Sequence, residues 1–304
     1  MSEKGSNIGA WLEAFRLRTL PLSLSCILMG TFLASSQGFF QWHIFLLAVF
    51  TTVLLQILSN LANDYGDSVH GADSAERQGP TRAVQTGAIS KSAMKKAVIL
   101  FSVLALACGL TLLYFTFRDQ FVYLIIFLTL GLASIFAAIN YTAGKKPYGY
   151  KGLGDLAVLI FFGFIGVGGT YFLFAKDINW VIMLPAASCG LFATGVLNVN
   201  NIRDIESDEK AGKISIPVRI GRQNAVIYHW AILSIGFLLS VIYVLLNQQN
   251  IYQWMFVVTL PLFYLNGRAA QVKKDPKQLD PYLKQLAIST LVFVLLFGIG
   301  LQLM

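Results

Sequence analysis

The sequence predicts an all-helical integral membrane protein. Apolar residues make up 56% of its 304 residues and charged residues only 12%, a composition unlike that of a soluble domain. The apolar residues fall into long runs separated by polar stretches, and a helix needs about 20 such residues to cross a bilayer. The chain therefore has room for about nine spans and no separate soluble domain, so residues 1–304 form one predicted transmembrane domain.

Turn residues and charges set the ends of the predicted helices. In chain order, "SQGFFQ" ends the first helix, an acidic stretch ends the second, and "FRDQ" separates the third from the fourth. "AKDIN" lies between the fifth and sixth helices and "NQQNIY" between the seventh and eighth, while longer polar connections follow the fourth, sixth and eighth. The predicted helices are residues 19–37, 42–63, 93–117, 120–141, 155–175, 180–201, 225–246, 251–268 and 284–304.

The basic residues predict which end of the bundle faces the cytoplasm. With a cytoplasmic N-terminus, all of the 23 Lys and Arg except Arg118 and Lys176 lie on the inner side. The polar loops 64–92 and 202–224 are then cytoplasmic and cap the site that they form. The net charge of +8 follows from this topology and favours contact with anionic lipid headgroups over nucleic acid. We therefore predict a multi-pass protein of the cell membrane, such as a bacterial inner membrane.

Two acidic stretches follow the second and sixth predicted helices. In "NDYGDSVHGAD" an amide and an acid are four residues apart, and in "NNIRDIESD" an amide and two acids are spaced by four, so each set falls on one face of a helix end. The repeat suggests two four-helix halves plus an added ninth helix, with the acidic sites meeting across a central cavity. The side chains concerned are Asn63 and Asp67 in the first stretch and Asn200, Asp204 and Asp208 in the second.

Opposed carboxylates beside a membrane-embedded cavity suit Mg²⁺, which binds one or two carboxylates together with phosphate oxygens of a substrate. A lipid diphosphate would complete that coordination, and its isoprenoid tail would occupy the apolar cavity. The predicted reaction is ionisation of an allylic diphosphate followed by capture of the carbocation by an acceptor. Basic side chains available as counter-charges are Arg77, Arg82, Lys145, Lys146, Arg203 and Lys213.

The paired stretches resemble the two Asp-rich motifs of the UbiA superfamily of intramembrane aromatic prenyltransferases, over nearly the whole chain. The interval from Asp67 to Asp73 is longer than the Asp-x-x-x-Asp of most members and is similar to that of the menaquinone branch, as are "GPTRAVQTG" and "PYGYKGLGD". The resemblance implies a single prenyltransferase domain that uses Mg²⁺. It would transfer a polyprenyl group from polyprenyl diphosphate to 1,4-dihydroxy-2-naphthoate, with loss of CO₂ and diphosphate, to give demethylmenaquinol.

The resemblance also implies roles for individual residues. Metal and diphosphate would be bound by both acidic motifs, and Tyr141 with Lys145 would lie near the diphosphate, with Lys146 as the alternative lysine. The implied catalytic residues are Asp67, Asp73, Asp204, Asp208, Tyr141 and Lys145, and the four Asp are the implied metal ligands. The implied substrate-binding residues are Asn63, Arg77, Arg82, Lys146, Asn200 and Arg203.

Several of these side chains also have a simpler interpretation. Lys145 and Lys146 are equally well explained as anchors at the membrane surface. Asp155 fits either a helix cap or a residue facing the cavity. Arg16 and Arg18 are most simply interface anchors, although the resemblance allows one of them to approach the diphosphate. We expect solvated side chains at Glu76, Glu206, Glu209 and His70.

Two other functions remain open from the sequence. An ion-coupled transporter also combines repeats with acidic residues, but transporters place these residues near the bilayer midplane, whereas the predicted helix interiors here contain almost no charge. Another UbiA-type enzyme with a different acceptor, such as 4-hydroxybenzoate or a glycerol phosphate, would share the donor chemistry.

Overall fold

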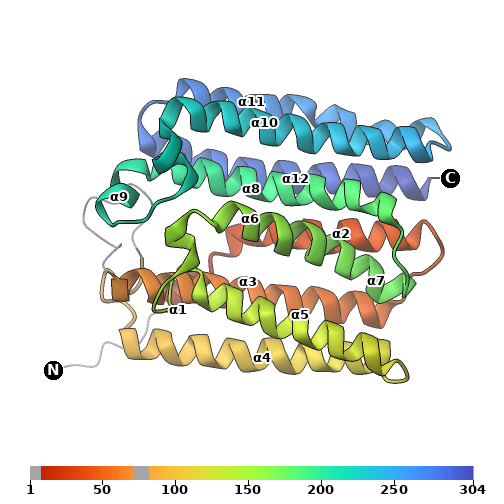
Figure 1. Ribbon diagram of the computed structural model, residues 1–304, viewed down its shortest axis with the longest axis horizontal. Coiled ribbons are helices and arrows are strands. Elements are labelled where there is room, and N and C mark those ends of the chain that lie inside the picture. The colour runs from red at the N-terminus through yellow and green to blue at the C-terminus, as the bar shows by residue number, and fades with distance from the viewer. Residues whose placement is uncertain (1–7, 71–81, 304) are drawn as a thin grey trace.

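The protein is a bundle of long helices that run side by side (Figure 1). The structure is a computed structural model that describes residues 8–70 and 82–303, with the side chain of His70 left out. Every regular element in these two ranges is helical. The prediction of an all-helical fold is therefore confirmed.

The first five spans are built from consecutive segments. A short helix, α1 (Ile8–Phe15), precedes α2 (Leu20–Ser35), whose first turn contains a proline. Ser90 caps the third long helix by accepting a hydrogen bond from the Ala93 N–H at 3.1 Å. The fifth span is α6 (Gly154–Val158), a π-helical stretch (Leu159–Gly169) and α7 (Thr170–Ala175). The long helices between α2 and α6 are α3 (Trp42–His70), α4 (Lys91–Phe117) and α5 (Phe121–Asn140).

The remaining helices complete the bundle around α12 (Asp280–Gln302). This last helix packs against α2 and against α8 (Met183–Arg203), so the ninth helix joins the two ends of the chain and is not an appendage to two finished halves. α8 is followed by the short α9 (Ile205–Lys210). Next come α10 (Ile216–Asn247), the 3-10 helix Ile251–Thr259 and α11 (Leu260–Val272).

Eight helical segments of the described chain are long and apolar enough to cross a membrane. The predicted eighth span, 251–268, is helical from Ile251 through Val272 and runs back along α10 (Figure 1), but it is not among the eight. Its apolar character is diluted by Gln253, Asn266 and Arg268. Together with the eight apolar segments it accounts for the nine predicted spans.

Small residues let the π-helical stretch approach α8 closely. A Cβ atom at Gly163 would lie 2.8 Å from the Ala186 carbonyl oxygen and 3.1 Å from the Gly190 Cα atom. Close backbone contact of this kind is typical of membrane helices, where lipid offers no hydrophobic drive for association. It holds the fifth span against the second half of the bundle.

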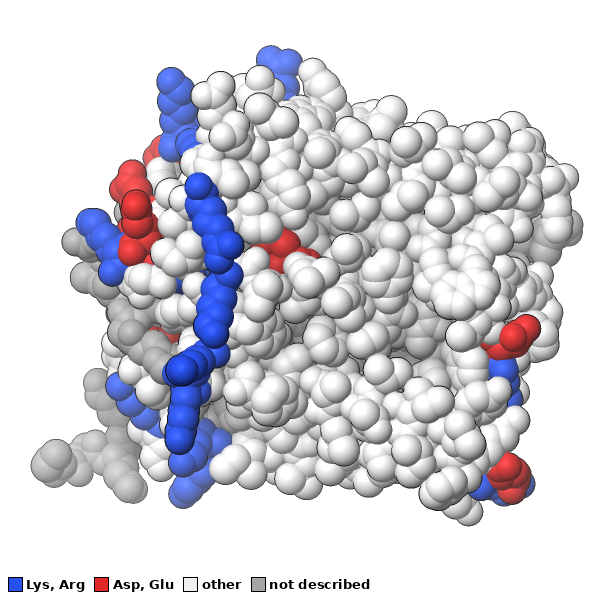
Figure 2. Space-filling view, in the orientation of Figure 1, with Lys and Arg blue, Asp and Glu red and all other residues white. Residues whose placement is uncertain are grey.

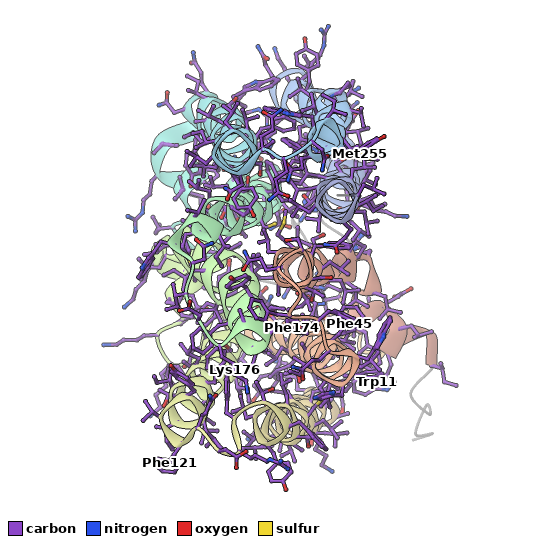
Figure 3. All side chains as sticks on the ribbon, turned by 90° about the vertical axis from the view of Figure 1, so that its right-hand side faces the viewer. Trp11, Phe45, Phe121, Phe174, Lys176 and Met255 are labelled. Atoms are coloured by element: carbon purple, nitrogen blue, oxygen red, sulfur yellow. The ribbon has the colours of Figure 1, made fainter. Side chains whose placement is uncertain are left out.

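Charged side chains gather at the ends of the bundle, and an apolar belt lies between them (Figure 2). The end that carries α9 has most of the basic side chains seen in this view. Figure 3 looks along the bundle from the other end, where Lys176 lies, and shows the long helices in two rows. The candidate site lies at the α9 end, and the orientation of that end in a cell stays a prediction.

Candidate active site

Both acidic motifs lie on helices at the α9 end of the bundle. α3 continues past residue 63 to His70, so Asp64 and Asp67 occupy its last turns, and α8 extends to Arg203 with Asp208 on α9. The predicted loops 64–92 and 202–224 therefore begin as helix. Ion pairs with basic residues compensate these buried carboxylates, which allows the helices to continue beyond the apolar runs.

Arg82 holds the first motif. Its guanidinium forms an ion pair with Asp67, and its Nε lies 3.6 Å from Asp64, which also pairs with Arg16. Tyr150 donates a hydrogen bond to Oδ1 of Asp67 at 2.8 Å. Asp64 and Asp67 are both buried, so these contacts supply the compensation that buried carboxylates need.

Asn63 belongs to the same network. Its backbone carbonyl accepts a hydrogen bond from Nη1 of Arg82 at 2.8 Å, and its side-chain oxygen accepts one from the Thr142 hydroxyl at 3.1 Å. Thr142 follows α5, so the first motif is fixed to the connection between the fourth and fifth spans. Asn63 also lines the cavity beside the motif.

Arg203 is the centre of the second motif. Its guanidinium donates to both oxygens of Asp204 at 2.9 and 2.7 Å, to the side-chain oxygen of Asn200 at 2.8 Å, and to Asp280 at the start of α12 at 2.6 Å. Asp208 is paired with Lys213, whose ammonium lies 2.9 Å from Oδ2. Lys213 therefore neutralises this oxygen.

Carboxylates of both motifs lie near enough to Tyr141 to act on its ionisation. Burial raises the pKa of Tyr141, and the carboxylates of Asp155, Asp208 and Asp67 add to the rise. Burial also raises the pKa of Asp208, which Lys213 opposes and the Asp204 and Asp67 carboxylates reinforce. Tyr150 connects the two motifs, because its hydroxyl donates to Asp67 at 2.8 Å and its carbonyl accepts from the N–H of Ile214, the neighbour of the Lys213 that pairs with Asp208. The raised pKa keeps Tyr141 protonated near neutral pH.

An apolar cavity of about 400 Å³ begins beside the motifs. Asn60, Asn63 and Tyr141 line it at the acidic end, while the walls deeper in the bundle are mostly aliphatic and aromatic. These walls come from α2 to α5 and the fifth span, and α8 contributes only Leu197. The cavity therefore lies mainly among the helices of the first half and the fifth span.

The donor set fits a hard cation. Asp67, Asp204 and Asp208 are buried carboxylates that converge from two helix ends, and carboxylate oxygens are the ligands that Mg²⁺ prefers. In the described residues no group of three His, Cys, Asp or Glu side chains lies close enough together to hold a metal ion. Arg82, Arg203 and Lys213 neutralise these three carboxylates instead. Asp73, the fourth predicted ligand, lies outside the described residues.

The other predicted residues are distributed unevenly around this centre. Lys145 and Lys146 are exposed, and neither has an ion-pair partner in the described ranges. Arg77, Glu76 and the side chain of His70 lie outside the described residues. Glu206 and Glu209 are exposed, as expected for solvated acids.

Asp155 lies in the first turn of α6, where an acid stabilises the free N–H groups of the helix end, and it is not among the residues that line the cavity. It is buried and also accepts a hydrogen bond from the Tyr228 hydroxyl at 3.3 Å.

Sequence reasoning missed three contributors to the site. Arg16 was interpreted mainly as an anchor but pairs with Asp64, and Asp280 was not singled out but holds Arg203. Tyr150 lies inside "PYGYKGLGD", a stretch noted only for its resemblance. No spacing rule connects these residues to the motifs, because each contact joins segments far apart in the chain.

Comparison with known proteins assigns the fold to a family. Residues 23–299 match the model of the UbiA prenyltransferase family. The chain belongs to this family. UbiA members similar to it include proteins of Escherichia coli (strain K12), 43% identical over 97% of this chain and 96% of that protein, and of Haemophilus influenzae (strain ATCC 51907 / DSM 11121 / KW20 / Rd), 42% identical over 96% and 95%. A protein of Mycobacterium tuberculosis (strain ATCC 25618 / H37Rv) is 31% identical over 95% and 96%. All three are named 1,4-dihydroxy-2-naphthoate octaprenyltransferase.

Solved structures of UbiA homologues share the fold. The apo homologue from Aeropyrum pernix K1 superposes with a TM-score of 0.70 at 18% identity, covering 94% of this chain and 97% of that one. A homologue from Archaeoglobus fulgidus, bound to DMAPP and Mg²⁺, gives a TM-score of 0.64 at 15% identity, covering 97% of this chain and 100% of that one. The predicted UbiA fold is confirmed by both.

Proposed function

We propose that this UbiA member transfers a polyprenyl group from polyprenyl diphosphate to 1,4-dihydroxy-2-naphthoate, forming demethylmenaquinol and releasing diphosphate and CO₂. The observation that carries the proposal is the meeting of two acidic motifs at the polar end of an apolar cavity. The choice of acceptor is supported by relatives up to 43% identical that carry the name of a naphthoate octaprenyltransferase.

The acidic motifs would bind the diphosphate end of the donor. Asp67, Asp204 and Asp208 would hold Mg²⁺ together with Asp73, while Asn63 and Asn200 orient the carboxylates or bond to phosphate oxygens. When bound, Mg²⁺ supplies the positive charge that stabilises the leaving diphosphate. The homologue that binds DMAPP and Mg²⁺ supports this choice of ion.

The basic side chains would exchange partners when the donor binds. Arg82, Arg203 and Lys213 now neutralise the carboxylates that the proposal assigns to metal. Metal binding would free these cations to contact phosphate oxygens, and the fork of an arginine suits that contact. The flexible Lys145 and Lys146 would approach the diphosphate from the exposed connection after α5. Arg77 would act beside Arg82.

The cavity would hold the isoprenoid tail and exclude water from the reacting carbon. Its aliphatic and aromatic walls begin next to Tyr141, so the allylic carbon would lie where the polar and apolar parts of the site meet. An allylic cation reacts readily with water, and a dry cavity prevents that side reaction. Tyr141, kept protonated by its raised pKa, would donate a hydrogen bond at this boundary.

The acceptor ring supplies the electrons for the new bond. The ring carbon that bears the carboxylate attacks the allylic carbon as the bond from that carbon to the diphosphate oxygen breaks. The bond from the ring to the carboxyl carbon then breaks, CO₂ departs, and its electron pair restores the aromatic ring. The site would face the cytoplasm, as the distribution of Lys and Arg predicts.

Purified protein given Mg²⁺, a long polyprenyl diphosphate and equal amounts of two acceptors tests the acceptor choice. We expect 1,4-dihydroxy-2-naphthoate to be prenylated in preference to 4-hydroxybenzoate, because a single ring would fill a bicyclic pocket incompletely. Faster reaction with 4-hydroxybenzoate would contradict the acceptor assignment and leave the donor site standing.

A further inference from the structure

We propose that Tyr150 is a positioning residue that couples the two acidic motifs and thereby sets the metal affinity of the site. The inference rests on the proposed function, in which Asp67 binds metal. Tyr150 lies in the 3-10 turn Tyr148–Lys151, in the connection between α5 and α6. Neither the family comparison nor the motif spacing assigns it a role.

Tyr150 contacts both motif segments at once. Its hydroxyl donates to Oδ1 of Asp67, on the last turns of α3, at 2.8 Å. Its backbone carbonyl accepts a hydrogen bond from the Ile214 N–H at 2.9 Å, in the segment that follows α9. A single residue therefore links the helix end of the first motif to the chain that leaves the second.

The turn that carries Tyr150 is held on both sides. On the α5 side, the Tyr148 hydroxyl donates to the Ala137 carbonyl at 2.9 Å. On the α10 side, Arg219 donates to the Lys151 carbonyl at 2.5 Å. Gly152 closes the turn with φ of 76°, and a Cβ there would lie 2.9 Å from the Ile214 carbonyl oxygen, so only glycine fits this approach. Tyr150 is thus anchored well enough to impose an orientation on Asp67.

The hydrogen bond divides the two oxygens of Asp67 between different partners. Oδ1 accepts from Tyr150, while Oδ2 pairs with Arg82. A cation that displaces Arg82 would find Oδ2 already aimed, because the neutral Tyr150 hydroxyl does not compete for the metal. Partners that orient a ligating carboxylate in this way typically change metal affinity by about 10- to 100-fold when removed.

The substitution Tyr150→Phe removes the hydroxyl and keeps the ring. Tyr171→Phe is the matched control, since it removes a buried tyrosine hydroxyl that donates to the Gln37 side chain at 2.6 Å, on α7 at the end of the bundle opposite α9 (Figure 1). Two readouts are measured over a Mg²⁺ series: thermal unfolding of the purified protein without substrate, and prenyl transfer. For Tyr150→Phe we expect the Mg²⁺ concentration at half effect to rise about tenfold in both, with turnover at saturating Mg²⁺ close to that of the parent. Tyr171→Phe should leave both midpoints within about twofold, which is less than about 0.5 kcal/mol.

Unchanged midpoints in Tyr150→Phe, or an equal shift in Tyr171→Phe, would overturn the coupling role. Asp67→Asn separates this failure from failure of the proposed function. If Asp67→Asn is inactive at every Mg²⁺ concentration while Tyr150→Phe behaves as the parent, only the coupling is wrong. If Asp67→Asn retains full activity, the metal site itself is wrong. If Tyr150→Phe does not fold, Arg219→Gln is used instead, because it loosens the same turn. It should raise both Mg²⁺ midpoints by about threefold, which is half the free energy of a tenfold change. No shift in this variant would again overturn the role.

Discussion

Replacing Asp204 by Asn tests the second motif most sharply. The side chain keeps its size and loses one negative charge at the point where Arg203 donates to both oxygens. If Asp204 binds Mg²⁺, an amide cannot supply the missing charge to the developing transition state. We expect turnover to fall by at least about 100-fold, as when a major electrostatic stabiliser is lost, which corresponds to about 2.7 kcal/mol.

The fold should survive this change. A buried charge that loses its partner destabilises a protein by about 3–5 kcal/mol, but Arg203 retains Asp280 at 2.6 Å and Asn200 at 2.8 Å. The structural loss is then closer to that of one charged hydrogen bond, about 1.5–3 kcal/mol. Thermal unfolding in detergent should show a folded protein with a lowered midpoint.

The assay is transfer of a long polyprenyl group to 1,4-dihydroxy-2-naphthoate by purified protein over a Mg²⁺ series. Glu206→Gln is the matched control, because it removes one charge from α9 at an exposed position. We expect its turnover to stay within about twofold of the parent, as for surface changes away from the site. Near-normal turnover in Asp204→Asn, or an equal loss in Glu206→Gln, would refute the assignment of Asp204 to the metal site.

Three further predictions concern topology, the cavity and pH. The distribution of Lys and Arg predicts that reporter fusions near residues 78, 148, 212 and 276 lie in the cytoplasm and those near 39, 119, 177 and 249 outside. A cytoplasmic signal from two or more of the outer four would contradict the topology. Gly131 lines the cavity, and a Cβ added there meets nothing within 4 Å, so Gly131→Leu should fold and fill part of the cavity. It should lower the ratio of kcat/KM for a long polyprenyl donor to that for a dimethylallyl donor by at least about tenfold. The exposed Phe136→Leu on the same helix should leave this ratio unchanged. Burial raises the pKa of Asp208, so the folded protein binds a proton there more readily than the unfolded chain, and ionisation of Asp208 lowers stability at pH values above that pKa. Asp208→Asn should therefore raise the temperature midpoint of unfolding at neutral pH while abolishing prenyl transfer. The rise in the midpoint should shrink as the pH falls through that pKa. A lower midpoint at neutral pH would contradict the reasoning.

The fold and the meeting of the motifs could be predicted because their signals are local or repeated. Long apolar runs give the spans, and the four-residue spacing in "NNIRDIESD" puts Asp204 and Asp208 on one side of a helix end. The same amide-to-acid spacing at Asn63 and Asp67 predicts the part of the site that the first motif supplies. Helix periodicity and charge distribution are therefore sufficient to locate the chemistry at one end of the bundle.

The remaining features depend on contacts between distant segments. α3 extends beyond residue 63 because Arg16 and Arg82 compensate its acids, and nothing near Asp64 in the chain shows this. The cavity is lined by helices from distant parts of the chain, and the close approach of Gly163 and Gly190 brings the fifth span against α8. Tyr150 reaches Asp67 only through the folded turn after α5.

The fate of the acceptor carboxyl group tests the central claim most directly. Purified protein is given Mg²⁺, a long polyprenyl diphosphate and 1,4-dihydroxy-2-naphthoate labelled with ¹⁴C in its carboxyl group, and released CO₂ and prenylated product are counted together. We expect one CO₂ for each prenylated ring, no label in the product, and neither product nor CO₂ when Mg²⁺ is chelated. A prenylated product that retains the label, or CO₂ release without the prenyl donor, would contradict decarboxylative prenyl transfer.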